Sequence, residues 1–129
     1  MSEVQNPSGG TGLPSNVAGA LSYFLGAFTG IFFLVVEKND RFVRFHAAQS
    51  IAVSVAMIVL WVALSVLSMV LGVVPIIGWL VSILLSLGVG LGSFFLWILL
   101  MFKAYQGQEW ELPVVGPQAR KLLAAPAAE

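Results

Sequence analysis

The sequence predicts an all-α membrane protein with three transmembrane helices, and two uncharged runs lead to this prediction. Residues 45–102 form 58 consecutive positions without Asp, Glu, Lys or Arg. A helix of that length would measure about 87 Å, whereas the hydrocarbon core of a bilayer is only about 30 Å thick. The run must therefore cross the bilayer, turn and cross back. Residues 4–36 form a second uncharged run, of 33 positions, whose apolar part adds one more crossing.

The composition excludes a soluble domain. Hydrophobic residues make up 59% of the chain and charged residues 9%, with a mean hydropathy of +0.97, whereas soluble proteins carry about 25% charged residues. The chain has no cysteine, which excludes disulfides and thiolate metal sites. With 129 residues, we expect a disordered polar tail over residues 1–15, a three-span membrane domain over 16–105 and a mostly extended cytoplasmic tail over 106–129.

The three predicted spans follow from the apolar runs and from the residues that interrupt them. Span 1 covers residues 17–36, span 2 residues 45–71 and span 3 residues 76–102. Between spans 2 and 3, Pro75 cannot donate a backbone hydrogen bond and two glycines permit a tight turn, which predicts a short hairpin loop. Spans 2 and 3 exceed the roughly 20 residues that a crossing needs, so we expect them to tilt or to extend beyond the hydrocarbon.

The basic residues predict the orientation of the chain. All six lie either between spans 1 and 2 or after span 3, at positions 38, 41, 44, 103, 120 and 121. Because basic residues remain on the cytoplasmic side of a membrane, the predicted N-terminus is outside and the first loop and C-terminus are cytoplasmic. The predicted location is the cell membrane, with several crossings.

Small residues recur at helical spacing and predict faces for helix packing, because close helix contacts in lipid favour Gly and Ser. The candidate packing face comprises Gly26, Gly30, Ser82, Ser86 and Gly90. Packing within the three-helix unit is the preferred interpretation, and self-association is the alternative. Gly88, Gly90 and Gly92 alternate in span 3, and both a kink and a close helix crossing would account for them.

The segment between spans 1 and 2 carries most of the polar chemistry. A helix beginning near Asn39 would place His46 and Gln49 on one face. Glu37 would end span 1, where a negative charge is unfavourable, so we expect a partner among Arg41, Arg44 and His46. Two interpretations stay open, an interfacial anchor on lipid phosphates and a docking site at the mouth of the bundle. The candidate interfacial docking site is Glu37, Arg41, Arg44, His46 and Gln49.

The same segment carries a family resemblance. Residues 37–50, together with Tyr-Phe-Leu-Gly at 23–26 and Lys-Ala-Tyr-Gln-Gly at 103–107, resemble the Tic-twenty-like family of small prokaryotic membrane proteins. That family is similar to the channel-type subunit of the chloroplast inner-envelope import translocon. The resemblance covers residues 21–116 and implies a helical membrane fold and a partner system that moves polypeptides. The plastid proteins are described with four spans, one more than this chain provides.

The residue inventory argues against an enzyme. The chain has one histidine and no cysteine, and its predicted spans contain no carboxylate, so they lack the ionisable groups and metal ligands that intramembrane catalysis uses. We expect no cofactor, no nucleic acid and no small-molecule substrate. The expected partners are the lipid bilayer and a second copy or another membrane protein.

Two functions follow from this inventory. The first is helix–helix association, as a subunit in protein translocation or as an oligomeric channel. The alternative is a lipid-associated, membrane-organising protein that uses Arg41 and Arg44 and has no role in transport.

Overall fold

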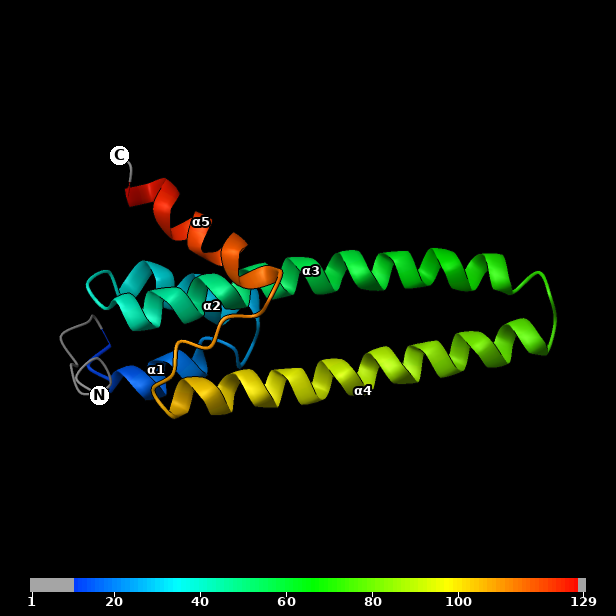
Figure 1. Ribbon diagram of the computed structural model, residues 1–129, viewed down its shortest axis with the longest axis horizontal. Helices are drawn as coiled ribbons and strands as arrows, with labels where there is room; N and C mark the ends of the chain where they lie inside the picture. Colours follow the sequence, from blue (N-terminus) through cyan, green and yellow to red (C-terminus); the bar gives the residue numbers. More distant parts are fainter. Residues whose placement is uncertain (1–10, 128–129) are drawn as a thin grey trace.

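The computed structural model describes residues 11–127, which form five helices and no strand in this range. The helices are α1 (Ser15–Leu21), α2 (Ala27–Val36), α3 (Arg41–Leu71), α4 (Ile77–Tyr105) and α5 (Val115–Ala127). Figure 1 shows α3 and α4 as a long hairpin, with α1, α2 and α5 gathered at one end. We name this end the head; it comprises α1, α2, residues 41–50 of α3, residues 97–105 of α4, the linker of residues 106–114, and α5. Residues 51–96 form the stalk.

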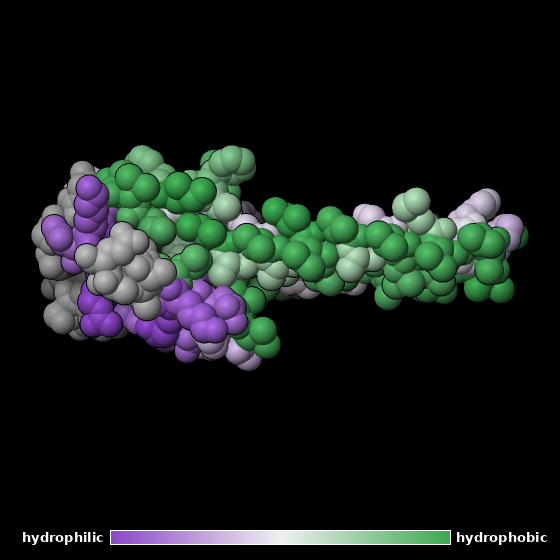
Figure 2. Space-filling model, turned by 90° about the horizontal axis from the view of Figure 1, so that it is seen from above, coloured by the Kyte–Doolittle hydropathy of each residue, from purple (hydrophilic) through white to green (hydrophobic). Residues whose placement is uncertain are grey.

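Helices α3 and α4 lie where spans 2 and 3 were predicted, and each is long and apolar enough to cross a membrane, with 31 and 29 residues. Helix α3 begins at Asp40, whose side chain accepts a hydrogen bond from the amide of Val43 at 3.2 Å and so caps the first turn. The hairpin closes tightly, because a Cβ on Gly78 would lie 1.8 Å from the carbonyl oxygen of Leu71. Figure 2 shows that the stalk is apolar along its length and that the hydrophilic residues gather on the head.

The prediction of one continuous span over residues 17–36 is wrong. The segment is broken into α1 and α2, and Gly26 has a φ of 62°, a value that glycine adopts without steric penalty. The break is supported by hydroxyl groups: Thr29 Oγ1 donates to the carbonyl of Ser22 at 2.9 Å, and Ser50 Oγ donates to that of Gly26 at 2.9 Å. The Thr29 hydroxyl thus gives the Ser22 carbonyl a donor at the break, and Ser50 adds a second donor to the Gly26 carbonyl, which also accepts from the Gly30 amide at 3.0 Å.

Helices α1 and α2 form a hairpin that begins and ends at the same end of the molecule (Figure 1). Ser15, at the start of α1, bonds to Asp40, at the start of α3, and Asn16 Nδ2 donates to the carbonyl of Tyr105, at the end of α4, at 3.0 Å. The turn between α1 and α2 contacts Ser50, ten residues after Asp40, so it lies about 15 Å from that end. The start of α1 and the loop between α2 and α3 therefore lie at the same end of the molecule, whereas the prediction placed them on opposite sides of the membrane.

The tail also differs from the prediction. Residues 115–127 form α5, where a mostly extended tail was expected. Ala119 is fully buried, and Leu122 and Val115 line a groove between α5 and α3; the helical spacing of these apolar residues explains why the segment folds once α3 supplies a surface. Of the tail predicted over residues 1–15, positions 1–10 lie outside the described residues, and Ser15 already belongs to α1.

Candidate functional site

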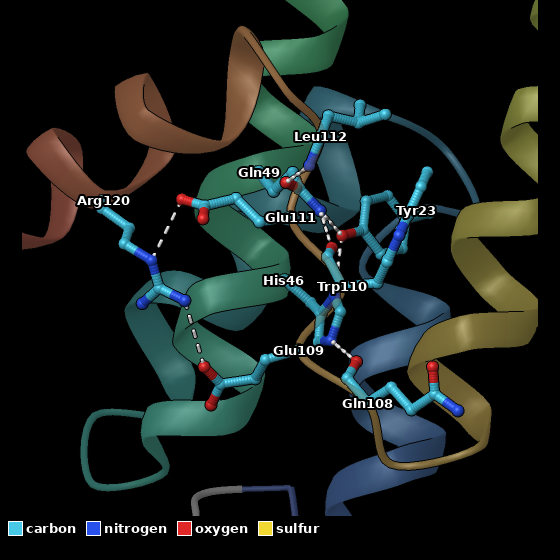
Figure 3. Close-up of polar contacts among 9 residues, drawn as sticks. All are labelled: Tyr23, His46, Gln49, Gln108, Glu109, Trp110, Glu111, Leu112 and Arg120. Atoms are coloured by element: carbon cyan, nitrogen blue, oxygen red, sulfur yellow. Dashed lines mark hydrogen bonds and ion pairs between the residues drawn. The ribbon is translucent and has the colours of Figure 1, made fainter.

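A buried polar network occupies the centre of the head and joins three parts of the chain (Figure 3). His46 and Gln49 lie nearly one turn apart on α3, and neither is exposed to solvent. Tyr23, from the turn between α1 and α2, is 2% exposed and lies between them. The linker passes over the other side and supplies backbone groups at Gln108, Trp110 and Leu112.

The hydrogen bonds of the network have defined directions. Nε2 of His46 lies 2.8 Å from the carbonyl oxygen of Gln108, which can only accept, so Nε2 carries the proton. Nδ1 of the neutral ring then accepts from the Tyr23 hydroxyl, at 2.7 Å. Gln49 Nε2 donates to the Tyr23 oxygen at 2.8 Å and to the carbonyl of Trp110 at 3.0 Å. Gln49 Oε1 accepts from the amide of Leu112 at 3.0 Å. The linker is thereby bonded to α3 through the side chains of both His46 and Gln49.

Aromatic rings enclose the imidazole. The Phe42 and Phe45 rings meet that of His46 edge-on at centroid distances of 4.7 and 5.0 Å, and both phenylalanines are 1% exposed. Trp97 Nε1 donates to the carbonyl of Tyr23 at 2.8 Å and so bonds α4 to the turn between α1 and α2. These apolar walls exclude water, and an unpaired polar atom inside them would be costly.

Arg120 fastens α5 over this network. Its guanidinium pairs with Glu111 at 3.1 Å and Glu109 at 3.4 Å, and it lies 4.4 Å from the centroid of the Phe45 ring. The two carboxylates come from the linker and the ring from α3, so one side chain joins three segments. An exposed ion pair contributes little alone, but the cation–π contact adds to it.

The structure brings together two of the five residues predicted as a docking site and separates the others. His46 and Gln49 share the network, whereas Arg41 is exposed and Arg44 donates to the carbonyl of Leu34 at 2.7 Å. Glu37 is 1% exposed and accepts hydrogen bonds from Thr11. The predicted basic partner for Glu37 is wrong, since no ion pair to it occurs within the described part of the chain.

Sequence reasoning missed the roles of Tyr23 and Arg120. Tyr23 appeared only within a motif, and Arg120 only as a basic residue of the tail. The available signal was the absence of other side-chain partners: His46 and Gln49 on a face that becomes buried require polar groups from outside α3. Which groups supply them depends on the fold.

The predicted packing face divides into two groups. Gly26 and Gly30 pack against α3 within the chain: a Cβ would lie 2.9 Å from Ser54 Oγ and 2.9 Å from the carbonyl oxygen of Ala47, respectively. A Cβ on Gly90 would meet nothing within 4 Å, and the same holds for Gly88 and Gly92. Ser82 bonds within α4 and Ser86 is half-buried. Helix α4 is continuous through the three glycines.

The chemistry of the network indicates a structural role. The polar side-chain atoms of Tyr23, His46 and Gln49 all make hydrogen bonds, so each of these atoms has a partner within the protein. Among the described residues, no group of three His, Asp or Glu side chains could hold a metal ion. What the arrangement does is hold the linker and α5 in one position on the head.

Comparison with known proteins places this architecture among membrane proteins. Residues 12–119 match the sequence model of a family described as the magnetosome magnetite crystal formation protein family. A UPF0132 membrane protein of Methanocaldococcus jannaschii is 44% identical over 110 residues, which cover 85% of this chain and 89% of the relative. One of Archaeoglobus fulgidus is 44% identical over 109 residues, 84% of this chain and 95% of the relative. No solved structure matches.

These findings overturn the resemblance drawn from the sequence. The predicted similarity to the Tic-twenty-like family is wrong, because the family that matches is a different one and its match contains residues 21–116, over which the resemblance was drawn. The role in polypeptide translocation, which only that resemblance implied, is therefore not supported. The motif of residues 37–50 instead supplies the capped start of α3 and the two side chains that bind the linker.

Proposed function

Because the chain belongs to the magnetosome magnetite crystal formation protein family and its archaeal relatives are membrane proteins, we propose that it organises the cell membrane as a non-enzymatic, wedge-shaped insertion. The stalk crosses the bilayer twice. The head is embedded in one leaflet and widens the protein there. The observation that carries this proposal is the difference in width between the head and the two-helix stalk (Figure 1).

The outer face of α2 supports the placement of the head in lipid. Phe28 is 82% exposed, and Ile31, Phe32 and Val35 are each more than half exposed. Such a continuous apolar face would be unfavourable in water. The re-entrant hairpin of α1 and α2 reaches about 15 Å into the head, which is half of a hydrocarbon core of about 30 Å. One leaflet then accommodates four helices and the base of α5, and the other leaflet only α3 and α4.

This asymmetry has a mechanical consequence. A protein that occupies more area in one leaflet than in the other is accommodated best where that leaflet is expanded, so its insertion favours curvature. The polar network contributes by making the head rigid, since it fixes the linker and α5 against α3. Transport is not needed for such a role, which corresponds to the membrane-organising alternative.

The topology can be tested with single cysteines, because the chain contains none of its own. We expect Pro14→Cys and Asn39→Cys to react with a membrane-impermeant maleimide from the same side, and Val73→Cys from the opposite side. The reason is that α1 and α2 return to the side on which they enter. Basic residues at the head predict that this side is cytoplasmic. Labelling of positions 14 and 39 from opposite sides would support a three-span topology and contradict the proposed wedge.

The curvature proposal predicts a change in vesicle size. Reconstitution at a fixed protein-to-lipid ratio should give smaller vesicles than lipid alone, measured by electron cryomicroscopy. Phe32→Asp should restore the protein-free diameter, because an acidic residue within the hydrocarbon costs about 3 kcal/mol near the bilayer centre and would expel α2. Asn39→Asp adds the same charge in the exposed loop and should behave as wild type. Equal diameters for wild type and Phe32→Asp would contradict the proposal.

A second candidate function, association with another membrane helix, is favoured by the glycines of α4. Gly88, Gly90 and Gly92 each lower helix stability by about 1 kcal/mol relative to alanine, and no neighbour among the described residues requires their small size. Glycine permits the close backbone approach by which helices associate in lipid. The partner would be a second copy or another membrane protein.

A direct role at a mineral surface, which the family description suggests, has little support from the described carboxylates. Glu37 and Asp40 are buried. Glu109 and Glu111 both pair with Arg120. None of the four is both exposed and unpaired, so none is available to an iron oxide surface. We therefore place the contribution of this chain in the membrane.

A further inference from the structure

We propose that the groove between α3 and α5 binds one anionic glycerophospholipid, with a hydrocarbon chain along α3 and the phosphate on Lys121. The groove has a volume of about 520 Å³, within the range of roughly 300–1,000 Å³ that is typical of small-molecule sites. One wall is formed by four apolar residues of α3, Ile51, Ala52, Val55 and Ala56. The other is formed by Val114 and by residues of α5, namely Val115, Gln118, Lys121 and Leu122. The inference rests on the proposed function in one respect, the placement of the head at the membrane.

The charges around the groove select an anion. Among the described residues that line it, Lys121 is the only charged one and none is a carboxylate. The neighbouring Arg120 is already engaged by Glu109, Glu111 and the Phe45 ring. Lys121 is exposed and has no ion pair with any residue that the structure describes. The guanidinium of Arg120 is therefore paired within the protein, whereas the ammonium of Lys121 is available to an external anion.

The position of the groove identifies the occupant as a lipid. Beyond Ala56, the apolar surface of α3 continues along the stalk, where Ile58 and Val59 are more than 60% exposed. A chain lying in the groove would thus pass directly into the hydrocarbon. Lys121 follows Arg120, whose guanidinium contacts the Phe45 ring near the start of α3, and the long lysine side chain can extend along the protein to the headgroups of the same leaflet. A soluble phosphate would use Lys121 but not the apolar walls, whereas a phospholipid uses both.

The test is native mass spectrometry of the full-length protein released from nanodiscs that contain equal amounts of phosphatidylglycerol and phosphatidylcholine with identical chains. We expect one retained phosphatidylglycerol per protein. Lys121→Gln should weaken retention about fivefold, since one basic residue near an anionic surface contributes about that factor. Lys38→Gln, which removes an exposed cation outside the groove, should leave retention unchanged.

A steric pair of variants tests the chain-binding wall. Ala56→Phe fills the groove and should abolish retention, whereas Ala63→Phe, on an exposed part of α3 outside the groove, should not. Equal retention of the two lipids by wild type would overturn the proposal, and so would unchanged retention in both Lys121→Gln and Ala56→Phe. Vesicle diameter separates this site from the proposed function: smaller vesicles without lipid retention would overturn the lipid site alone. Retention without an effect on diameter would overturn the wedge alone.

Discussion

A Gln49→Leu variant should release the linker from α3 while the two long helices remain folded. The substitution removes three hydrogen bonds at once, because the Gln49 amide binds the Tyr23 hydroxyl, the Trp110 carbonyl and the Leu112 amide. It also removes a donor that orients the hydroxyl bonded to His46. Each buried group left without a partner costs about 1–3 kcal/mol. We expect hydrogen exchange at the Leu112 amide to accelerate by a factor of at least about ten.

The measurement is hydrogen–deuterium exchange of the full-length protein in nanodiscs, followed by mass spectrometry of peptides that cover residues 106–123. Gln108→Leu provides a matched control. Its side chain is exposed, and only its backbone carbonyl takes part in the network, so the exchange of Leu112 should stay as in wild type. Unchanged protection in Gln49→Leu would show that Arg120 and apolar packing hold the tail without the network.

The second large effect concerns Gly30 and Gly90, two glycines that the sequence assigns to the same predicted packing face. Gly30→Leu should lower the free energy of unfolding by about 3 kcal/mol, because a Cβ at this position would lie 2.9 Å from the carbonyl oxygen of Ala47, a backbone atom that cannot move aside without shifting α3. Gly90→Leu should leave stability unchanged or raise it by up to about 1 kcal/mol, since the space there is open and leucine favours the helix.

Unfolding in detergent micelles, followed by far-ultraviolet circular dichroism, compares the two variants. A similar loss of stability in both would mean that α4 packs against the chain more closely than the structure indicates. Gly90→Leu also tests the second candidate function. If α4 associates with another copy, cross-linking in nanodiscs should detect an oligomer for wild type and a monomer for this variant.

The long helices could be predicted from the sequence, and the broken one could not. The uncharged run of residues 45–102 has only one arrangement that fits a bilayer, and α3 and α4 adopt it. Residues 17–36 look equally apolar, but their break depends on Ser50, which lies 24 residues beyond the carbonyl of Gly26 to which it bonds. Glycine is common within transmembrane helices, so Gly26 alone does not reveal a turn.

The candidate site was predicted in part for a similar reason. The spacing of His46 and Gln49 placed them on one face of a helix, which is where they lie. Their partners in the linker are backbone groups of Gln108, Trp110 and Leu112. Because every residue has backbone groups, the sequence does not indicate which of them will bond to His46 and Gln49. The choice of these three depends on where α4 ends and how the chain turns back.

The long sequence separations within the polar network have a consequence for how the protein is made. The bonds from His46 and Gln49 to the linker span 61 to 63 residues. Their partners therefore leave the ribosome only after both long helices have been synthesised. Until then the start of α3 carries two polar side chains without these partners. Because burying unpaired polar groups in hydrocarbon is costly, we expect this part of α3 to remain among the lipid headgroups until the linker is made. Arrival of the linker permits the head to close, so a segment made after both long helices completes the packing of a segment made before them.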